Sequence, residues 1–288
     1  MVKMLLSSGF MMMVLSAFFF ALSDILVKFI SPPIGVIQIA FFRFLLGALM
    51  LLPMLLSSGR SLTGNSVGLL LVRGLAGTVA FFCLLKSITM IPLSNAIVLF
   101  YSFPLFTVIF SVFLLKEPIK KMEILLAIVG TTGIYVLVNP ASHSYTMGHI
   151  LGILAGCLAG LVMVLTRSLR KNNGPLIIYF YFCIVGGAAS FPFFITNFNA
   201  PNLLQFILLA LLAVIFLIAQ VLMNQGFKFC KAPEGSVILM SEVVFAGIAG
   251  ILIFNDTLSL SFWAGAALIL GSGVGLNLIA RQNPSPLA

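Results

Sequence analysis

Four charged side chains stand inside long apolar stretches of this sequence: Asp24, Arg43, Arg73 and Glu242. A charge at the centre of a membrane helix costs about 2.5–3.5 kcal/mol, whereas a central Leu returns only about 0.3–0.6 kcal/mol. The four together therefore cost on the order of 10 kcal/mol unless they meet water or one another. We expect them to face a shared polar cavity rather than lipid.

Glu242 is the sharpest of these candidates, because it lies in the middle of the run VILMSEVVFAGIAGILIF with no basic residue near it on the same helix. Two interpretations stay open. In the first, Glu242 forms a structural ion pair with Arg43 or Arg73. In the second, it lines a transport pathway, where a buried carboxylate can exchange a proton or bind a cationic group.

Of the other three charges, Asp24 and Arg43 also allow two roles each. Asp24 precedes Lys28 by four residues, so the two share a helix face and can pair, or Asp24 can line the outer mouth of a pathway. Arg43 keeps its charge at all relevant pH values, so it acts as a structural clamp or binds an anionic substrate group. Arg73 lies close enough to one end of its stretch to reach the membrane interface.

Uncharged polar and aromatic side chains add weaker candidates for the same pathway. Interhelical hydrogen bonds explain the polar ones equally well. With 28 Phe in the chain, most aromatic rings must pack or face lipid. Besides the four charges, the candidates for a substrate or proton pathway are Phe82, Asn95, Tyr101, Ser102 and Gln220.

Membrane helices are the elements that must position these residues. The chain is 61% hydrophobic and 7% charged, whereas a soluble domain carries about 25% charged residues. A membrane helix needs about 20 mostly apolar residues. The sequence therefore predicts an all-α integral membrane protein with ten transmembrane helices, near Phe10–Ile30, Ile34–Leu56, Val67–Ile88, Ser94–Leu115, Glu123–Val138, Met147–Thr166, Leu176–Thr196, Leu203–Phe227, Gly235–Phe254 and Phe262–Ala280.

The basic residues predict how these helices are oriented. A net charge of +9 would suit nucleic acid, but the Lys and Arg lie between the apolar stretches, which is a topology signal. With the N-terminus in the cytoplasm, only Lys28 and Lys86 fall near outer helix ends. We expect no nucleic-acid partner, a multi-pass plasma membrane (bacterial inner membrane) location and both termini in the cytoplasm. The residues on the inner side are then Lys3, Arg60, Lys116, Lys120, Lys121, Arg167, Arg170, Lys171, Lys228, Lys231 and Arg281.

The chain also repeats itself with a shift of 139 positions. The shift pairs Glu117 with Asp256, Ser102 with Ser241, Pro104 with Val243, and Phe103 with Glu242. Each half holds five helices, an odd number, so the sequence predicts two inverted five-helix repeats, residues 1–140 and 141–288. Pro104 predicts a kink in the first copy, and the second copy offers no proline for a matching one.

The sixth predicted helix carries Gly152, Gly156 and Gly160 on one face. Such small-residue faces let helices approach closely, so this face packs inside the bundle or forms a homodimer contact. Monomer and homodimer both stay open.

Motifs for other chemistries are missing from the sequence. It contains no GxxxxGK[ST], HExxH or GxSxG pattern, and its four Cys show no metal-ligand spacing. We expect neither an enzyme nor a bound cofactor or metal.

Three stretches together resemble a known family. They are FFRF at Phe41–Phe44, the run from Arg73 to Pro118 that ends in VFLLKEP, and SEVVFAGIAGILIFND from Ser241. They are similar to the EamA branch of the drug/metabolite transporter superfamily, over nearly the whole chain. The resemblance implies export or uptake of amino acids, nucleobases, vitamins or related metabolites. It also implies that helices one to four and six to nine enclose the cavity and that helices five and ten are peripheral.

The repeat, the intramembrane charges and the resemblance predict a secondary active carrier. It would move a small polar or amphipathic metabolite by alternating access, coupled to protons or by exchange. Uptake of S-adenosylmethionine or another cationic metabolite is a specific alternative. A non-transporting membrane scaffold or receptor is the alternative from another class, and it predicts that neutralising Glu242 or Arg43 leaves the phenotype intact.

Overall fold

The computed structural model describes residues 8–31, 34–57, 62–138, 146–196, 198–254 and 259–282, and every element in these ranges is helical. Ten stretches within them are long and apolar enough to cross a membrane. Each predicted helix is therefore present, with ends that differ by a few residues. Lys3, Arg60 and Asp256, which the sequence analysis used, lie outside the described residues, as does the side chain of Arg281.

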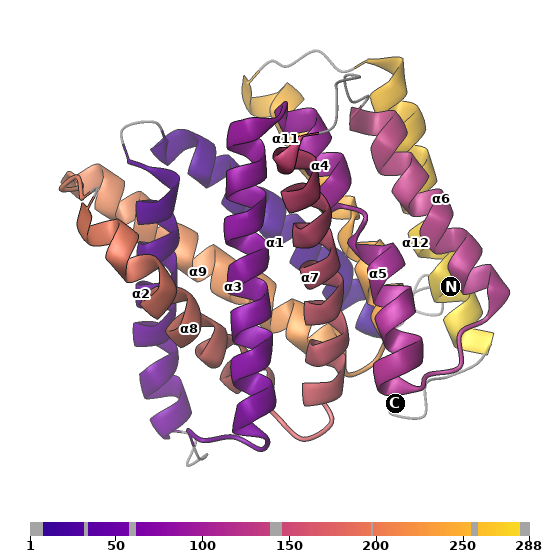
Figure 1. The fold of residues 1–288 in the computed structure, drawn as a ribbon, viewed down its shortest axis with the longest axis horizontal. Coiled ribbons are helices and arrows are strands. Elements are labelled where there is room, and N and C mark those ends of the chain that lie inside the picture. The colour runs from indigo at the N-terminus through magenta and orange to yellow at the C-terminus, as the bar shows by residue number, and fades with distance from the viewer. Residues whose placement is uncertain are drawn as a thin grey trace.

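Five spans come from each half of the chain (Figure 1). In the first half they are α1 (Ser8–Ile30), α2 (Val36–Ser57), α3 (Val67–Met90), α4 (Leu93–Phe100) continued by α5 (Phe103–Phe110) and the π-helix Ser111–Leu115, and α6 (Lys121–Val138). In the second half they are α7 (Met147–Leu169), α8 (Pro175–Thr196), α9 (Leu203–Gly226), α10 (Ala232–Leu239) continued by α11 (Ser241–Phe254), and α12 (Leu260–Gln282).

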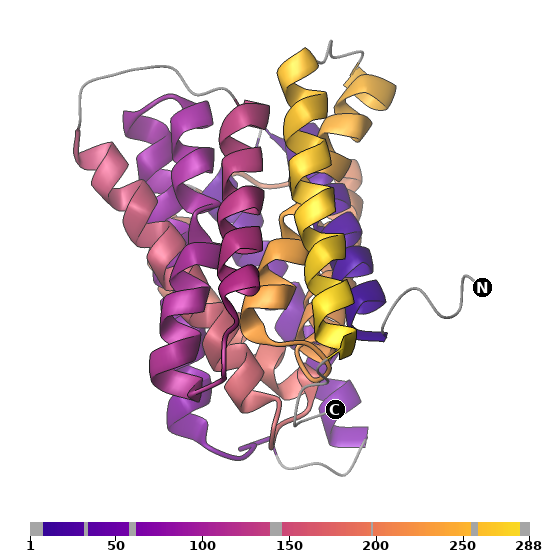
Figure 2. The same ribbon diagram turned by 90° about the vertical axis from the view of Figure 1, so that its right-hand side faces the viewer.

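The two halves pack on each other with twofold symmetry. Helix α3 packs along α7, and α1 packs along α9, while α2 pairs with α8 and α6 with α12. Exchanging the halves converts the α3–α7 pair into the α9–α1 pair and leaves the other two pairs unchanged. Helices α6 and α12 lie side by side at the right-hand edge of the bundle in Figure 1 and face the viewer in Figure 2.

The contacts at the helix ends show that the repeats are inverted. A Cβ on Gly9, at the start of α1, would lie 3.1 Å from Cys230 Sγ, whereas one on Gly148, at the start of α7, would lie 2.7 Å from Ile91. The first helices of the two halves therefore begin at opposite ends. We call the end formed by residues 62–66, 116–121, 170–175 and 227–231 the basic end. Eight described basic residues lie at or next to it: Lys116, Lys120, Lys121, Arg167, Arg170, Lys171, Lys228 and Lys231.

The fourth and ninth spans are both interrupted, although the sequence predicted two continuous helices with a kink in the first only. The fourth breaks at Tyr101 and Ser102, and the ninth breaks at Met240, 139 residues later. At equivalent places in the two spans, a serine hydroxyl at the break satisfies a carbonyl group of the preceding helix. Ser102 Oγ donates to the carbonyl of Leu99 over 2.5 Å, and Ser241 Oγ donates to that of Ile238 over 2.7 Å. Broken membrane helices are tolerated where other groups satisfy the freed backbone in this way.

The glycine face of α7 packs inside the bundle, which is the first of the two roles that the sequence analysis gave it. A Cβ on Gly156 would lie 2.7 Å from the carbonyl oxygen of Leu99, and one on Gly160 would lie 2.8 Å from that of Phe103. These glycines let α7 approach the backbone of the fourth span on either side of its break.

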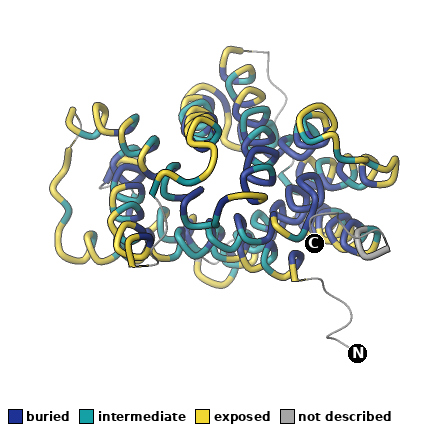
Figure 3. The backbone as a smooth tube through the Cα atoms, turned by 90° about the horizontal axis from the view of Figure 1, so that it is seen from below, coloured by how far each residue is buried: buried dark blue, intermediate teal, exposed yellow. Residues whose placement is uncertain are grey.

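The burial pattern is that of a membrane protein. Buried residues gather where helices face one another, and many exposed residues lie on the outer sides of the helices (Figure 3). Large apolar side chains are among them, since Leu203 and Leu252 are each 78% exposed. An outer surface of this kind suits lipid.

Candidate functional site

The carboxyl groups of Asp24 and Glu242 meet inside the bundle. Asp24 is on α1 and Glu242 is in the first turn of α11, and the two side chains are within hydrogen-bonding reach of each other. Glu242 lies ten residues after Ala232, where its span begins. At 1.5 Å per residue this is about 15 Å, the middle of a bilayer core of about 30 Å.

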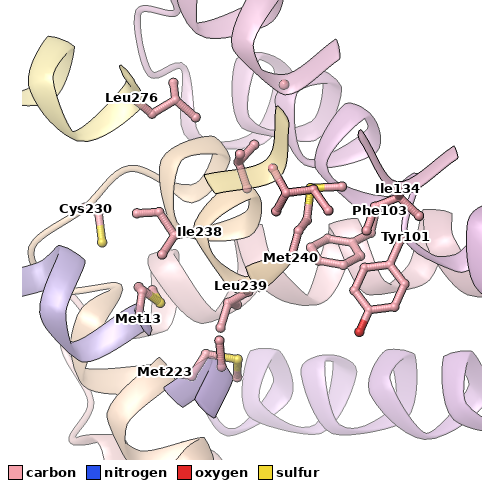
Figure 4. Close-up of a cluster of buried hydrophobic side chains, with 14 of the residues drawn as sticks. Met13, Tyr101, Phe103, Ile134, Met223, Cys230, Ile238, Leu239, Met240 and Leu276 are labelled. Carbon is pink, nitrogen blue, oxygen red and sulfur yellow. The ribbon is translucent and has the colours of Figure 1, made fainter. Parts of the chain in front are cut away.

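Tyr101 joins this pair from the break in the fourth span. Its hydroxyl group is within hydrogen-bonding reach of Glu242. Its ring packs against Phe100 and Phe103, and its oxygen points away from Phe103 and Ile134 (Figure 4). The two broken spans therefore bring a phenol and a carboxyl group to the same place. The side chain of Asp24 is exposed and that of Glu242 is half-buried, so the polar centre formed by Asp24, Tyr101 and Glu242 is not packed over.

Arg43 lies among aromatic rings rather than in an ion pair with Glu242. Its guanidinium carbon is 4.0 Å from the ring centroid of Phe216, 5.0 Å from that of Phe44 and 5.3 Å from that of Phe81. Cation–π contacts of this kind stabilise a desolvated cation by about 2 kcal/mol. Its Nε atom has no hydrogen-bond partner among the described residues. The positive charge of Arg43 interacts electrostatically with the carboxyl group of Asp24, so Arg43 lies near the polar centre.

Arg73 is buried between helices, whereas the sequence analysis had allowed it to reach the membrane interface. It is 1% exposed, and it donates from Nε to Thr166 Oγ1 over 3.2 Å and from Nη2 to Gln220 Oε1 over 3.3 Å. It also lies 4.7 Å from the ring centroid of Phe182. Its Nη1 atom has no partner among the described residues. The side chain of Gln220 thus accepts a hydrogen bond from Arg73 and is not part of the carboxyl pair.

The remaining predicted residues are spread over the bundle. Phe82 packs against Phe81 and Phe193 on the side of α8. Asn95 is buried in α4, and Ser102 donates its hydroxyl proton within its own broken span. Of the nine candidates, the structure brings Asp24, Tyr101 and Glu242 together, with Arg43 beside Asp24, and places Arg73 and Gln220 in a separate pair.

Two ion pairs at the basic end connect the halves, and the sequence analysis missed both. Arg167 Nε lies 3.2 Å from Glu117 Oε1, and Lys231 Nζ lies 2.9 Å from Glu123 Oε1. Lys231 also donates to the carbonyl of Pro118 over 2.9 Å. In both pairs the carboxylate belongs to the first half and the cation to the second. The turn KEPIKK carries both signs of charge, but no local pattern pairs its Glu117 with a residue 50 positions away.

The opposite end of the bundle carries a groove. A groove of about 460 Å³ lies there between α2, α3 and α8, lined by residues that include Gln38, Leu85 and Phe193. Gln38 exchanges two hydrogen bonds with the backbone of Asn199, of 2.6 and 3.1 Å. The molecule therefore has polar groups at mid-depth, ion pairs across its halves at one end and a groove at the other.

Comparison with known proteins identifies the family that shares this sequence pattern. The sequence model of the EamA-like transporter family matches residues 7–139 and again residues 146–278. The chain is 30% identical to the pseudopaline exporter of Pseudomonas aeruginosa, over 96% of this chain and 98% of that protein. It is 25% identical to the S-adenosylmethionine uptake transporter of Rickettsia bellii, over 86% of each chain.

A riboflavin transporter of Brucella anthropi is 24% identical over 83% of this chain and 86% of that protein. A solved crystal structure superposes with a TM-score of 0.84 at 18% identity, over 96% of this chain and 98% of that one, which shows the same fold. The relatives are transporters and not enzymes, and the ten apolar spans make this chain a multi-pass membrane protein. The chain belongs to the EamA-like transporter family.

Proposed function

We propose that this transporter is a secondary carrier for a small metabolite that bears a cationic or amine group. The observation that carries the proposal is the contact between Asp24 and Glu242 at mid-depth, with Tyr101 beside them. Two carboxyl groups in contact can share one proton. A bound ammonium or sulfonium group can replace that proton as the counter-charge, which gives proton-coupled transport or exchange a common physical basis.

The two arginines favour a substrate that also carries an anionic group. Arg43 Nε and Arg73 Nη1 are buried donors that no described residue satisfies. Leaving such a donor without a partner costs about 1–3 kcal/mol, and more for a charged group. A carboxylate near Arg43 would lie within reach of the carboxyl pair, because Arg43 acts on Asp24. The substrate class that fits both features is an amino-carboxylate metabolite.

Alternating access supplies the transport cycle in this proposal. Inverted repeats with a site at mid-depth are typical of carriers that rock one half against the other. The Glu117–Arg167 and Glu123–Lys231 ion pairs cross the boundary between the halves, so they hold the basic end closed and must break when that end opens. The groove at the opposite end suits a conformation in which the site is reached from there.

The excess of basic residues favours the cytoplasm for the basic end and a bacterial inner membrane for the protein, with both termini inside. In this orientation the groove between α2, α3 and α8 lies on the outer side, which suits an outward-facing form. The relatives include an exporter and an uptake transporter. The proposal accordingly concerns the class of substrate and the coupling rather than one direction of flux.

Transport by purified protein in liposomes tests the proposal. S-adenosylmethionine, a basic amino acid and a neutral amino acid are loaded in turn, and flux is followed from pH 5.5 to 8.5. We expect Glu242→Gln and Asp24→Asn each to lower the flux of the transported compound at least tenfold and to flatten its pH dependence. Lys86→Gln, which alters an exposed charge at the opposite end, should transport like the unchanged protein.

If none of the three compounds is transported, an unbiased metabolite comparison of cells with and without the protein supplies the test compound. Normal flux by Glu242→Gln at every pH, with the compound so found, would show that the carboxyl pair does not carry the transport step. The purified yields of all variants are compared, so that equal amounts of protein are reconstituted.

A further inference from the structure

We infer that a cleft at the basic end is a binding site for a phosphate group, separate from the transport site. The cleft has a volume of about 270 Å³ and is lined by Arg167, Arg170, Lys171, Asn172 and Lys228. Four of these five residues are cationic and none is acidic. The volume is about nine times the roughly 30 Å³ that one water molecule occupies in the liquid, so a phosphate group fits.

The floor of the cleft is formed by two arginines that are fixed by backbone carbonyls. Arg167 Nη1 donates to the carbonyls of Phe227 and Lys228 over 2.7 and 2.9 Å. Arg170 donates from Nε to the carbonyl of Asn224 over 2.9 Å, and from Nη2 to the side chain of Gln225 over 2.7 Å. These bonds join the end of α7 to the end of α9, so the floor is preorganised.

The charge of this floor is only partly compensated. Arg167 also pairs with Glu117, but the acceptors of Arg170 are neutral carbonyl and amide oxygens. Arg170 is 9% exposed, and burial lowers the pKa of its guanidinium group below the usual value. A nearby anion would relieve that cost, because it stabilises the charged form.

Two exposed lysines supply the groups that are free to bind a ligand. Lys171 follows Arg170 in the turn between α7 and α8, and Lys228 follows α9 on the facing segment. The described contacts give Lys171 no side-chain partner, and those of Lys228 consist of its position 5.7 Å from the ring centroid of Phe229. Lysine ammonium groups bind phosphate as point charges. Asn172 also lines the cleft, and its side-chain amide adds a hydrogen-bond donor.

The depth of the cleft favours a phosphate carried by the membrane itself. It lies where α7 and α9 end, so we expect it at the level of the lipid headgroups, and basic pockets between membrane helices bind such headgroups. An anionic phospholipid and a free phosphate present the same chemistry to the two lysines. The proposal is therefore the phosphate site, and the experiment distinguishes its source.

Binding to the purified protein in a neutral detergent tests the proposal. Short-chain phosphatidylglycerol, short-chain phosphatidylcholine and inorganic phosphate are each titrated, and binding is followed by the shift in thermal unfolding midpoint and by calorimetry. We expect phosphatidylglycerol to bind and Lys171→Gln/Lys228→Gln to weaken it about 30-fold, about fivefold for each Lys removed. Lys120→Gln/Lys121→Gln is the matched control, since it removes two exposed charges at the same end but outside the cleft.

Each outcome decides the question. Binding of inorganic phosphate with the same dependence on Lys171 and Lys228 supports a site for free phosphate groups, and binding of phosphatidylglycerol alone supports a headgroup site. Equal binding of phosphatidylcholine, or an equal loss in both double variants, overturns the proposal. The readout needs no transport, so its failure leaves the proposed carrier function untouched, and the reverse also holds.

Discussion

The ion pair between Glu123 and Lys231 gives the most direct test of how the basic end is held closed. Glu123→Gln keeps an oxygen that can accept from Lys231 Nζ, now at 2.9 Å from Glu123 Oε1, but it removes the negative charge. A hydrogen bond to a charged group contributes about 1.5–3 kcal/mol. Because one acceptor remains, we expect the variant to lose about 1–2 kcal/mol of closure free energy. The population with an open basic end should then rise roughly 5- to 30-fold.

The chain contains its own reporter for this opening. Cys230 is 1% exposed and adjoins Lys231, and burial, followed by the nearby charge of Glu234, raises the pKa of its thiol well above the usual value. Thiol reagents react with the thiolate, so closure suppresses labelling through both access and ionisation. In the closed protein, labelling should stay slow at neutral pH and increase only as the pH rises. Opening should bring the pKa down toward its ordinary value and accelerate labelling.

A background with Cys83→Ser and Cys157→Ser leaves Cys230 and Cys183 as the two thiols. Cys183 is 1% exposed within α8, so it reports unfolding rather than opening. We expect a membrane-impermeant maleimide to label Cys230 about 5- to 30-fold faster in Glu123→Gln, with no change at Cys183. Lys121→Gln, an exposed charge change in the first turn of α6, should label like the background. Equal Cys230 rates in the two variants would refute the reasoning, as would a parallel rise at Cys183, which indicates unfolding.

Two further predictions concern stability and are measured by unfolding of the purified protein in a detergent series. Gly156→Ala should be less stable than Gly271→Ala by about 1–3 kcal/mol, because a Cβ at Gly156 meets the Leu99 carbonyl at 2.7 Å and one at Gly271 meets nothing within 4 Å. Equal stability of the two would show that the α7 contact is not close-packed. Asn173→Ala should cost about 1–3 kcal/mol, since Asn173 exchanges bonds of 2.7 and 2.8 Å with the backbone of Asn65. Asn172→Ala, which leaves those bonds in place, should cost less than 0.5 kcal/mol, about the usual limit for a surface change, and an equal loss in both would contradict this account.

Hydropathy and charge were sufficient to predict the spans and their inverted arrangement. The lack of charge leaves the bilayer as the only suitable solvent, and five spans per half force the second repeat to run in the opposite direction. The break at Met240 was not predictable in this way, because Val243 replaces the proline that marks the equivalent break. It is recognisable in hindsight from Ser241, whose hydroxyl satisfies the Ile238 carbonyl as Ser102 satisfies that of Leu99.

The sequence analysis singled out four intramembrane charges, but it did not identify their partners. Cost arguments show that Asp24, Arg43, Arg73 and Glu242 need compensation, and they favour pairs of opposite charge. In the structure Glu242 meets another acid, Arg43 meets aromatic rings, and Arg73 meets Thr166 and Gln220. Which helices face each other decides these partners, and a single sequence carries no direct record of that packing.

The two broken spans share their position in the repeats but differ in the side chain that follows each break. Both breaks lie at equivalent positions, so both expose the start of a half-helix at mid-depth. Such a start attracts negative charge by about 0.3–1 kcal/mol through the helix dipole. The second half places Glu242 in the first turn of α11, while the first half places Phe103 in the first turn of α5, where it packs against Tyr101. The breaks are therefore common to both repeats, whereas a carboxylate follows only the second break. Asp24 of α1 is the partner of this carboxylate, so the carboxyl pair does not follow the symmetry of the repeats.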